Sequence, residues 1–420
     1  MLVAFGAAFG DSDDITWTPS GRFAASSPAF ASVNKFKGGD DFLLFSSFNA
    51  LRPGHIKMVR GIKDAVKNNT VDQLSATYLL TGDFQWPNDV QVIPHDVFNN
   101  KSIVVPDGFL VPGHANGGVY VVEVGNLVET MVQRTVTLTS NTDGYFYHMG
   151  EWVDMNGDGR LDFVTAKSNA KLDGGRLVWL EHPEGGLDVE NWTEHEIVAG
   201  PDVGIKVVQD LAQYPNEIVV FGAEFFNQKL SVQRVSTVDG SLVARGVIDD
   251  TEILDAYSVD FVDLNSDGKH QLLVNNHEKS SKTNGIWTYS VPEDLINGKY
   301  VKNTVATGFK NAFSLTVPGM SPGFPYAVWP KTSSEGRKRA HIIVAGDGDY
   351  SFHAYHPNGS SSLYNYGETL AINYEGTIGS LAWSDLDRDG YLEIWVPNYD
   401  GDYIEMIKTS PASNDATYIQ

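Results

Sequence analysis

The chain has no cysteine among its 420 residues, which excludes disulfide bonds and thiolate metal sites. It also has no apolar run near the ~18 residues that a transmembrane helix needs. Basic residues are few, since 30 Lys and Arg stand against 53 Asp and Glu, for a formal net charge of −23. We therefore expect neither nucleic acid nor an anionic membrane as a partner, and an anionic ligand would need a locally basic pocket.

The sequence is rich in turns, with 41 Gly and 18 Pro, and one acidic turn occurs three times. The copies are "DMNGDGRLD" (154–162), "DLNSDGKHQ" (263–271) and "DLDRDGYLE" (385–393). An EF-hand loop would close with Glu at its twelfth position, but the twelfth residue from Asp154 is Thr165. The turns therefore belong to another architecture, and the apolar runs that follow them predict strands.

The spacing of these turns indicates a repeat. Asp154 and Asp263 are 109 residues apart, and Asp263 and Asp385 are 122 apart, each about twice a unit of roughly 55–60 residues. Weaker copies fit near positions 34, 96, 210 and 317, which gives seven units. Each unit contains four strand-like runs, and no segment shows helical periodicity. This pattern predicts an all-β, seven-bladed β-propeller, a single domain over residues 1–420 that is expected to be monomeric.

The first residues are expected to close the ring. The run "LVAFGAAF" (2–9) reads as a strand that completes the last blade, because closure removes free sheet edges. The sequence lacks the basic start of a signal peptide before this run.

The three acidic turns predict structural Ca²⁺ sites, because positions 1, 3, 5 and 9 can direct side-chain oxygens at one hard cation and the carbonyl at position 7 completes the shell. The Asp263 turn has glutamine at position 9 and is expected to bind more weakly. A polar turn without metal is the alternative. The predicted ligands are Asp154, Asn156, Asp158, Arg160 and Asp162; Asp263, Asn265, Asp267, Lys269 and Gln271; and Asp385, Asp387, Asp389, Tyr391 and Glu393.

Candidate chemistry lies on the opposite face, which we call the rim face: there the loops between second and third strands surround the central tunnel. His114 in "PGHANGG" and His148 are the first candidates for catalysis, together with Tyr257. His148 and Tyr257 each precede an acidic turn by six residues, so both should start an innermost strand. Residues expected to bind substrate are Arg52, His55, Tyr147, Lys167, Lys171 and His277. By contrast, His195 and His353 are expected to lie in strands.

These residue types suit proton abstraction next to a carboxylate. Histidine titrates near neutral pH, a nearby cation stabilises enolate-like charge, and histidine or tyrosine can protonate a leaving oxygen. On a uronic acid this chemistry is β-elimination, the reaction of a lyase. The chain has neither a G-x-S-x-G motif nor a nucleotide-binding fingerprint. A transition metal held by His114, His148 or His277 is an alternative that the residue types leave open.

The stretch "YFYHMGEWVDMNGDGRLDFVTAKS…GGRLVWLEHPEGG…WTEHEIVAGPDV" resembles fungal secreted propellers. These are the L-rhamnose-α-1,4-D-glucuronate lyases, active on gum arabic and other arabinogalactan chain ends, and the propeller part of aldos-2-ulose dehydratases. The acidic turns also look like the FG-GAP/VCBS class of calcium loops. The resemblance implies a secreted, extracellular polysaccharide lyase with an anionic plant polysaccharide as substrate.

Other functions stay open from the sequence. A carbohydrate-binding propeller without catalysis would tend to repeat the same binding residues in every blade, whereas the rim loops here differ in length and content. A dehydratase-like enzyme and an integrin-like adhesion protein are further alternatives. Four glycosylation sequons, which begin at Asn68, Asn100, Asn191 and Asn358, agree with secretion as a glycoprotein.

Overall fold

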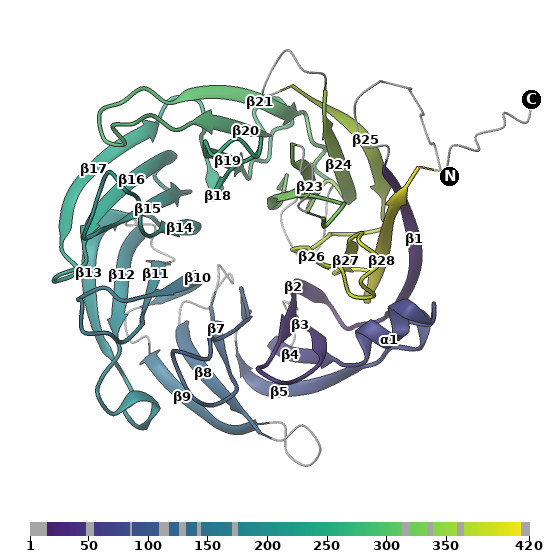
Figure 1. Cartoon of the computed structure of the whole chain (residues 1–420), viewed down its shortest axis with the longest axis horizontal. Coiled ribbons are helices and arrows are strands. Elements are labelled where there is room, and N and C mark those ends of the chain that lie inside the picture. Colours follow the sequence, from purple (N-terminus) through teal and green to yellow (C-terminus); the bar gives the residue numbers. More distant parts are fainter. Residues whose placement is uncertain are drawn as a thin grey trace, which may run out of the picture.

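In the computed structural model, four-stranded antiparallel sheets are arranged as a ring around a central axis (Figure 1). The structure describes residues 15–47, 54–84, 86–108, 117–125, 132–140, 144–169, 175–312, 320–333, 339–358 and 365–412. These residues form seven such sheets, which confirms the predicted all-β, seven-bladed β-propeller.

The strands of each blade follow one another from the axis outward. Blades 1 to 3 contain β2 (Pro28–Lys35), β3 (Asp41–Ser47), β4 (Gly54–Val59) and β5 (Ala76–Phe84); β6 (Gln91–Val92), β7 (Ser102–Pro106), β8 (Gly118–Val124) and β9 (Val132–Ser140); and β10 (Tyr145–Val153), β11 (Asp162–Asn169), β12 (Gly175–Glu181) and β13 (Thr193–Gly200). Blades 4 and 5 contain β14 (Ile205–Val208), β15 (Glu217–Glu224), β16 (Lys229–Ser236) and β17 (Leu242–Asp249); and β18 (Ala256–Val262), β19 (Gln271–Asn276), β20 (Gly285–Ser290) and β21 (Val301–Thr307). Blades 6 and 7 contain β22 (Pro325–Val328), β23 (His341–Ala345), β24 (Ser351–Pro357) and β25 (Tyr366–Asn373); and β26 (Ala382–Ser384), β27 (Glu393–Asn398), β28 (Tyr403–Pro411) and β1 (Ile15–Ala24).

The second strand of each blade is buried on both faces, because the neighbouring blades cover it. In β3, Phe42 and Leu44 pack into a hydrophobic cluster shared with blade 2. The alternate residues Leu43 and Phe45 point the other way and pack into a cluster that contains Trp395 of blade 7. Side chains alternate between the two faces of a strand, so a nearly continuous apolar run such as "FLLF" serves two interfaces at once.

The seventh sheet joins the two ends of the described chain. β1 pairs antiparallel with β28, with Ile15 opposite Pro411 and Ala24 opposite Tyr403, so β1 is the outermost strand of blade 7. The segment 2–9, which we expected to form the closing strand, lies outside the described residues.

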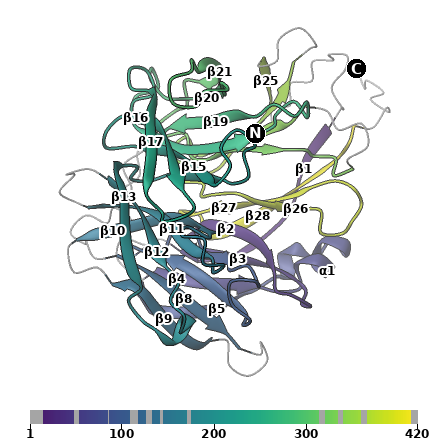
Figure 2. The same cartoon turned by 60° about the vertical axis from the view of Figure 1, so that its left-hand side comes forward.

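Two details differ from the sequence-based expectations. The turn between the first and second strands of blade 6 spans 329–340, after β22, and is not centred on position 317, which lies outside the described residues. The described residues also include three short helical segments: α1 (Ile62–Lys67), η1 (Val71–Gln73) and η2 (Gly186–Asp188). Figure 2 shows α1 at the edge of the ring near β3, which it contacts. Its six residues are too few to show a helical period in the sequence.

No helix in the described part of the chain is long and apolar enough to cross a membrane.

Removal of the closing strand should cost the ring its stability. A chain that lacks residues 1–24 leaves the backbone groups of β28 without their partner strand. It also loses Phe23 and so uncovers the part of the core, beside Trp395, against which Phe23 packs. We expect a melting temperature lower by several degrees and a tendency to aggregate, measured by calorimetry and light scattering. A chain that lacks only residues 1–14 keeps β1 and should behave like the full chain. Equal melting temperatures for the two truncations would contradict this role of β1.

Candidate functional site

Three of the predicted residues meet near the axis of the ring. The rings of Tyr257 in β18 and His277, just after β19, are stacked with centroids 4.4 Å apart and an interplanar angle of 19°. His148 in β10 lies edge-on to Tyr257 at 5.9 Å. The structure thus brings blade 3 and blade 5 together, as expected for side chains at the start of innermost strands.

Two phenylalanines complete this group. Phe324, just before β22, stacks on Tyr257 at 5.0 Å, and Phe30 of β2 lies 5.8 Å from His148 and 6.1 Å from Phe324. Rings from blades 1, 3, 5 and 6 therefore pack against one another across the axis. We call Phe30, His148, Tyr257, His277 and Phe324 the central cluster. Sequence reasoning missed both phenylalanines, although each lies at the start of an innermost strand, as His148 and Tyr257 do.

Burial keeps both histidines of the central cluster neutral. His148 has no exposed surface and His277 is 9% exposed. Loss of hydration lowers the pKa of His148 to about 3 and that of His277 to about 4. Nδ1 of His277 lies 3.0 Å from the carbonyl oxygen of Pro322. A carbonyl can only accept, so Nδ1 carries the hydrogen and Nε2 keeps its lone pair.

Nε2 of His277 faces a carboxylate that sequence reasoning did not single out. Oδ2 of Asp347 lies 3.7 Å away, and the Asp347 side chain is 26% exposed. Burial, reinforced by the negative charge of Asp400, raises the pKa of Asp347 to about 7. Asp347 belongs to the loop 346–350, between β23 and β24, on the rim face. A carboxylate that titrates near neutral pH is suited to acid–base chemistry.

The hydroxyl of Tyr257 stays protonated. Burial, together with the nearby charge of Asp347, raises its pKa well above the ordinary value for tyrosine. The Tyr257 side chain is 6% exposed. Beside the central cluster, the Asp347 carboxyl group titrates near neutral pH, and within the cluster lie the neutral imidazole of His277 and the protonated phenol of Tyr257.

A layer of charged side chains lies further along the same inner strands. Nζ of Lys206 in β14 is 3.6 Å from Oε1 of Glu151 in β10 and 3.8 Å from Oδ1 of Asp260 in β18. Burial raises the pKa of Glu151, and the positive charge of Lys206 opposes that rise. Lys206 thus links blades 3 and 5 electrostatically below the central cluster.

The structure places other predicted residues away from the central cluster. Tyr147 packs into the core between blades 2 and 3, and its hydroxyl donates a 3.0 Å hydrogen bond to Glu194 of β13. Lys167 also binds Glu194 and lies over the ring of Tyr145. These side chains stabilise the surface of blade 3 and are already engaged within it. His55 lies half-buried in β4, where its backbone N–H donates to Ser47.

Three predicted residues, Arg52, His114 and Lys171, lie outside the described residues, so their roles stay predictions.

The three acidic turns share one hydrogen-bonding arrangement. The residue at position 9 is buried and accepts a hydrogen bond from the backbone N–H at position 2. These pairs are Asp162 with Met155 at 2.8 Å, Gln271 with Leu264 at 3.1 Å, and Glu393 with Leu386 at 2.8 Å. Position 9 therefore fixes the turn onto the following strand, which explains why glutamine can replace a carboxylate there.

A basic side chain of the protein lies against predicted ligands in each turn. Arg160 binds Asp158 within its own turn, and Nε of Arg339 donates a 3.1 Å hydrogen bond to Asn265. Nζ of Lys408 lies 2.6 Å from Asp387 and 3.0 Å from Asp389. The expectation that all loop oxygens point at one cation omitted these basic partners. In two of the three turns the partner lies outside the turn: Arg339 precedes β23, and Lys408 lies in β28.

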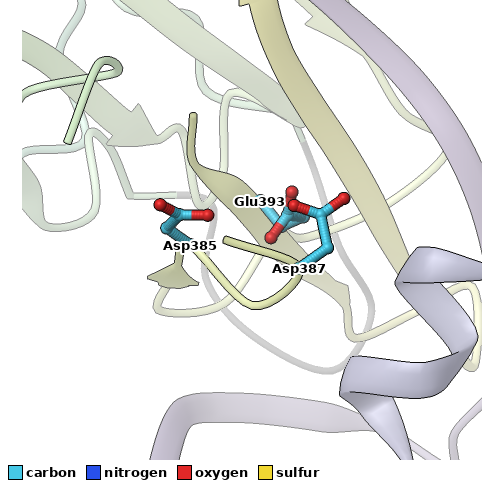
Figure 3. A group of neighbouring side chains, drawn as sticks. All are labelled: Asp385, Asp387 and Glu393. Atoms are coloured by element: carbon cyan, nitrogen blue, oxygen red, sulfur yellow. The ribbon is translucent and has the colours of Figure 1, made fainter. Parts of the chain in front are cut away.

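The blade 7 turn fits a metal ion best. Among the described residues, Asp385, Asp387 and Glu393 form the one group of three acidic or metal-binding side chains whose ligand atoms all lie within 4.8 Å of one another (Figure 3). Oδ1 of Asp385 and Oε1 of Glu393 are buried there without a hydrogen bond, and Nζ of Lys408 lies 3.9 Å from Oε1 of Glu393. Burial raises the pKa of Glu393 to about 7. Carboxylate oxygens that lack donors are the ligands that Ca²⁺ prefers.

Comparisons with known proteins give no functional assignment. No protein-family model matches the sequence, and no curated protein matches it. One similar solved structure, described as "Structure of Dos1 propeller", is 10% identical to this chain with a TM-score of 0.45, and the match covers 90% of this chain and 81% of that one. That likeness is too distant to carry an argument about function.

Calcium is expected to stabilise the chain through the blade 7 turn. Binding to the folded state alone raises the free energy of unfolding by about 2.7 kcal/mol when free calcium is 100 times Kd. We expect millimolar calcium to raise the melting temperature of the wild type, relative to chelator, and to leave that of Asp385→Asn unchanged. Asp263→Asn is the matched control and should keep the response, because its turn has no such carboxylate group. A melting temperature of the wild type that is the same in calcium and in chelator would contradict the presence of this calcium site.

Proposed function

We propose that the chain is a secreted polysaccharide lyase that cleaves L-rhamnose-α-1,4-D-glucuronate linkages at arabinogalactan chain ends, with the central cluster as its active site. The observation that carries the proposal is the juxtaposition of Asp347, His277 and Tyr257 on the rim face. The pKa of Asp347 lets its carboxylate accept a proton near neutral pH, and the raised pKa of Tyr257 keeps its hydroxyl able to donate one. The resemblance of the blade 3 stretch supports the substrate class.

The proposed reaction is a β-elimination. A base removes the proton from C5 of the glucuronate, the C–H electrons form the C4–C5 double bond, and the C4–O bond to rhamnose breaks. The leaving oxygen takes a proton, so the products are rhamnose and a 4,5-unsaturated uronate. No oxidant, reductant or water is consumed.

Asp347 is the best-suited base among the described residues of this site. Its pKa of about 7 lies near the working pH, whereas burial makes both imidazoles weak bases. We expected a histidine in this role, and the loss of hydration around His148 and His277 is the reason for the change. His277 stacks on Tyr257, whose hydroxyl supplies the proton to the leaving oxygen.

His148 is a positioning residue in this proposal. Its ring has no exposed surface and packs against Tyr257, Phe30 and Phe324. It can orient the tyrosine but cannot touch a substrate in this arrangement. Of the cations predicted to neutralise the uronate, Lys167 is engaged by Glu194, which leaves that role to Arg52 and Lys171.

A carbohydrate-binding propeller without catalysis is the second candidate. The observation that favours it is the burial of His148 and His277, which lowers both pKa values and makes both imidazoles weak bases. Under both readings an extracellular location agrees with the sequons at Asn68 and Asn191, whose side chains are exposed.

Loss of the base should abolish turnover and leave the fold intact. Gum arabic is incubated with Asp347→Asn, and the conjugated product is followed by ultraviolet absorbance. Removal of a general base typically costs about 10²–10⁴-fold in rate. His195→Ala is the control, because His195 stacks on Trp179 in blade 3, away from the central cluster, and should keep wild-type turnover. Rhamnose release without the chromophore would mean hydrolysis, and binding without release would favour the second candidate.

The pH dependence of turnover should follow the ionisation of the Asp347 carboxyl group. Its carboxylate is the competent form, so kcat/KM should rise as pH increases through about 7, where the carboxyl group loses its proton. His277 is neutral throughout that range, because its pKa is about 4. Tyr257→Phe should lower the rate but keep the same rise. A profile that is flat between pH 6 and 8 would exclude Asp347 as the base.

A further inference from the structure

A cleft of about 350 Å³ lies between blades 5 and 6 and shares no residue with the central cluster. The end of β21, the segment Gly308–Lys310, and strands β24 and β25 form its walls. Pockets that bind small molecules usually have volumes of about 300–1,000 Å³, so the cleft has room for one small ligand.

His353 lines the cleft and lies between two carboxylates. Nε2 is 2.5 Å from Oδ2 of Asp349, and Nδ1 is 2.7 Å from Oε1 of Glu368. Although burial by itself would lower it, the hydrogen bonds to Asp349 and Glu368 raise the pKa of His353. Ionised carboxylates only accept, so two such partners favour the imidazolium form of His353, in which both ring nitrogens carry hydrogen.

This cation orients both carboxylates. A doubly protonated imidazole has no lone pair, so His353 cannot remove a proton from a ligand. Oδ1 of Asp349 also accepts a 2.8 Å hydrogen bond from the backbone N–H of Lys310, which fixes that carboxylate further. Glu368 is hydrogen-bonded to His353 through Oε1 and also to Tyr355, and its side chain, which lines the cleft, is 47% exposed. The arrangement is therefore suited to binding, because the positions of both carboxylates are fixed.

The charges of the lining residues cancel. Asp349 and Glu368 are negative, and His353 and Lys310 are positive. Because positive and negative charges of the lining residues are equal in number, the cleft favours neither an anionic nor a cationic ligand. The lining also contains hydrogen-bonding side chains that contact one another: the Ser351 hydroxyl donates a 3.0 Å hydrogen bond to Oδ1 of Asn373, and Tyr355 is hydrogen-bonded to Glu368. The amide nitrogen of Asn373 and the carboxylate of Glu368 are the groups best placed to contact a ligand.

We propose that this cleft binds a neutral pyranose, with Glu368 accepting hydrogen bonds from neighbouring sugar hydroxyls. Carboxylates and amides fixed by neighbouring groups match the paired hydroxyls of such a ring, and the small residues Ala306, Gly308 and Ala371 leave space beside it. The loop 346–350 carries both Asp347, which lies beside the central cluster, and Asp349, which lines this cleft. The two sites therefore share one loop on the rim face, but the cleft proposal stands on its own residues and does not need the proposed reaction.

Saturation-transfer NMR tests the proposal with three probes: the methyl α-pyranosides of D-glucose, D-galactose and D-mannose. We expect at least one to bind the full chain, and Glu368→Gln to weaken its binding at least tenfold in a titration. Glu196→Gln is the matched control, because it changes an outer-strand glutamate of blade 3 that is also exposed. Asn373→Ala, on the exposed side of the cleft, should weaken binding too, and thermal melting reports whether each variant is folded.

The outcomes separate the alternatives. Absence of transfer from all three sugars, or equal affinities for Glu368→Gln and Glu196→Gln, overturns the proposal. Preference for a charged probe, such as methyl glucuronoside or glucosamine, overturns the neutral ligand class. Because binding of the pyranosides is measured without gum arabic, an inactive chain that still binds them would refute the lyase proposal and support the cleft.

Discussion

The burial of every second strand between two neighbouring blades is the constraint on which this structure depends. Side chains such as Phe42 and Leu44 need blade 2, and Leu43 and Phe45 need blade 7, so blade 1 cannot complete its core alone. The second strand of every blade needs a neighbouring blade on each side to bury its side chains, and only a closed ring provides both neighbours for all blades. β1 therefore has a structural importance beyond its single strand, because it completes the sheet through which blade 7 covers blade 1.

Closure of the ring also determines the chemistry near the axis. Seven innermost strands converge there, so side chains from blades 1, 3, 5 and 6 reach one another and exclude water from the space between them. Loss of hydration then shifts the pKa values of His148, His277 and Asp347 in the directions that favour their uncharged forms. The functional properties of the central cluster thus come from the same packing that holds the blades together.

The two faces of the ring differ in role: one carries turns that stabilise the scaffold, and the other carries loops suited to ligand binding. The turns between first and second strands carry the acidic sequences, whose position 9 residues anchor each turn in the core. The loops between second and third strands carry the groups suited to ligands, and the loop 346–350 supplies one aspartate to the central cluster and another to the cleft beside it. Metal binding on one face can therefore stabilise the scaffold without entering the chemistry proposed for the other.

The sequence by itself determined the architecture, because the spacing of the acidic turns and the four apolar runs per unit are local patterns that repeat. It also located the rim loops and indicated that His148 and Tyr257 begin innermost strands, because both precede an acidic turn by a fixed number of residues. The tertiary structure decided which side chains meet. Phe30 and Phe324 are almost 300 residues apart yet lie 6.1 Å from each other, and Lys408 reaches the acidic turn of blade 7 from the next strand. Contacts across a ring depend on its closure, and no local pattern in the sequence encodes them. The same reason explains why Asp347 went unnoticed and why His353 was assigned to a strand without its two carboxylates.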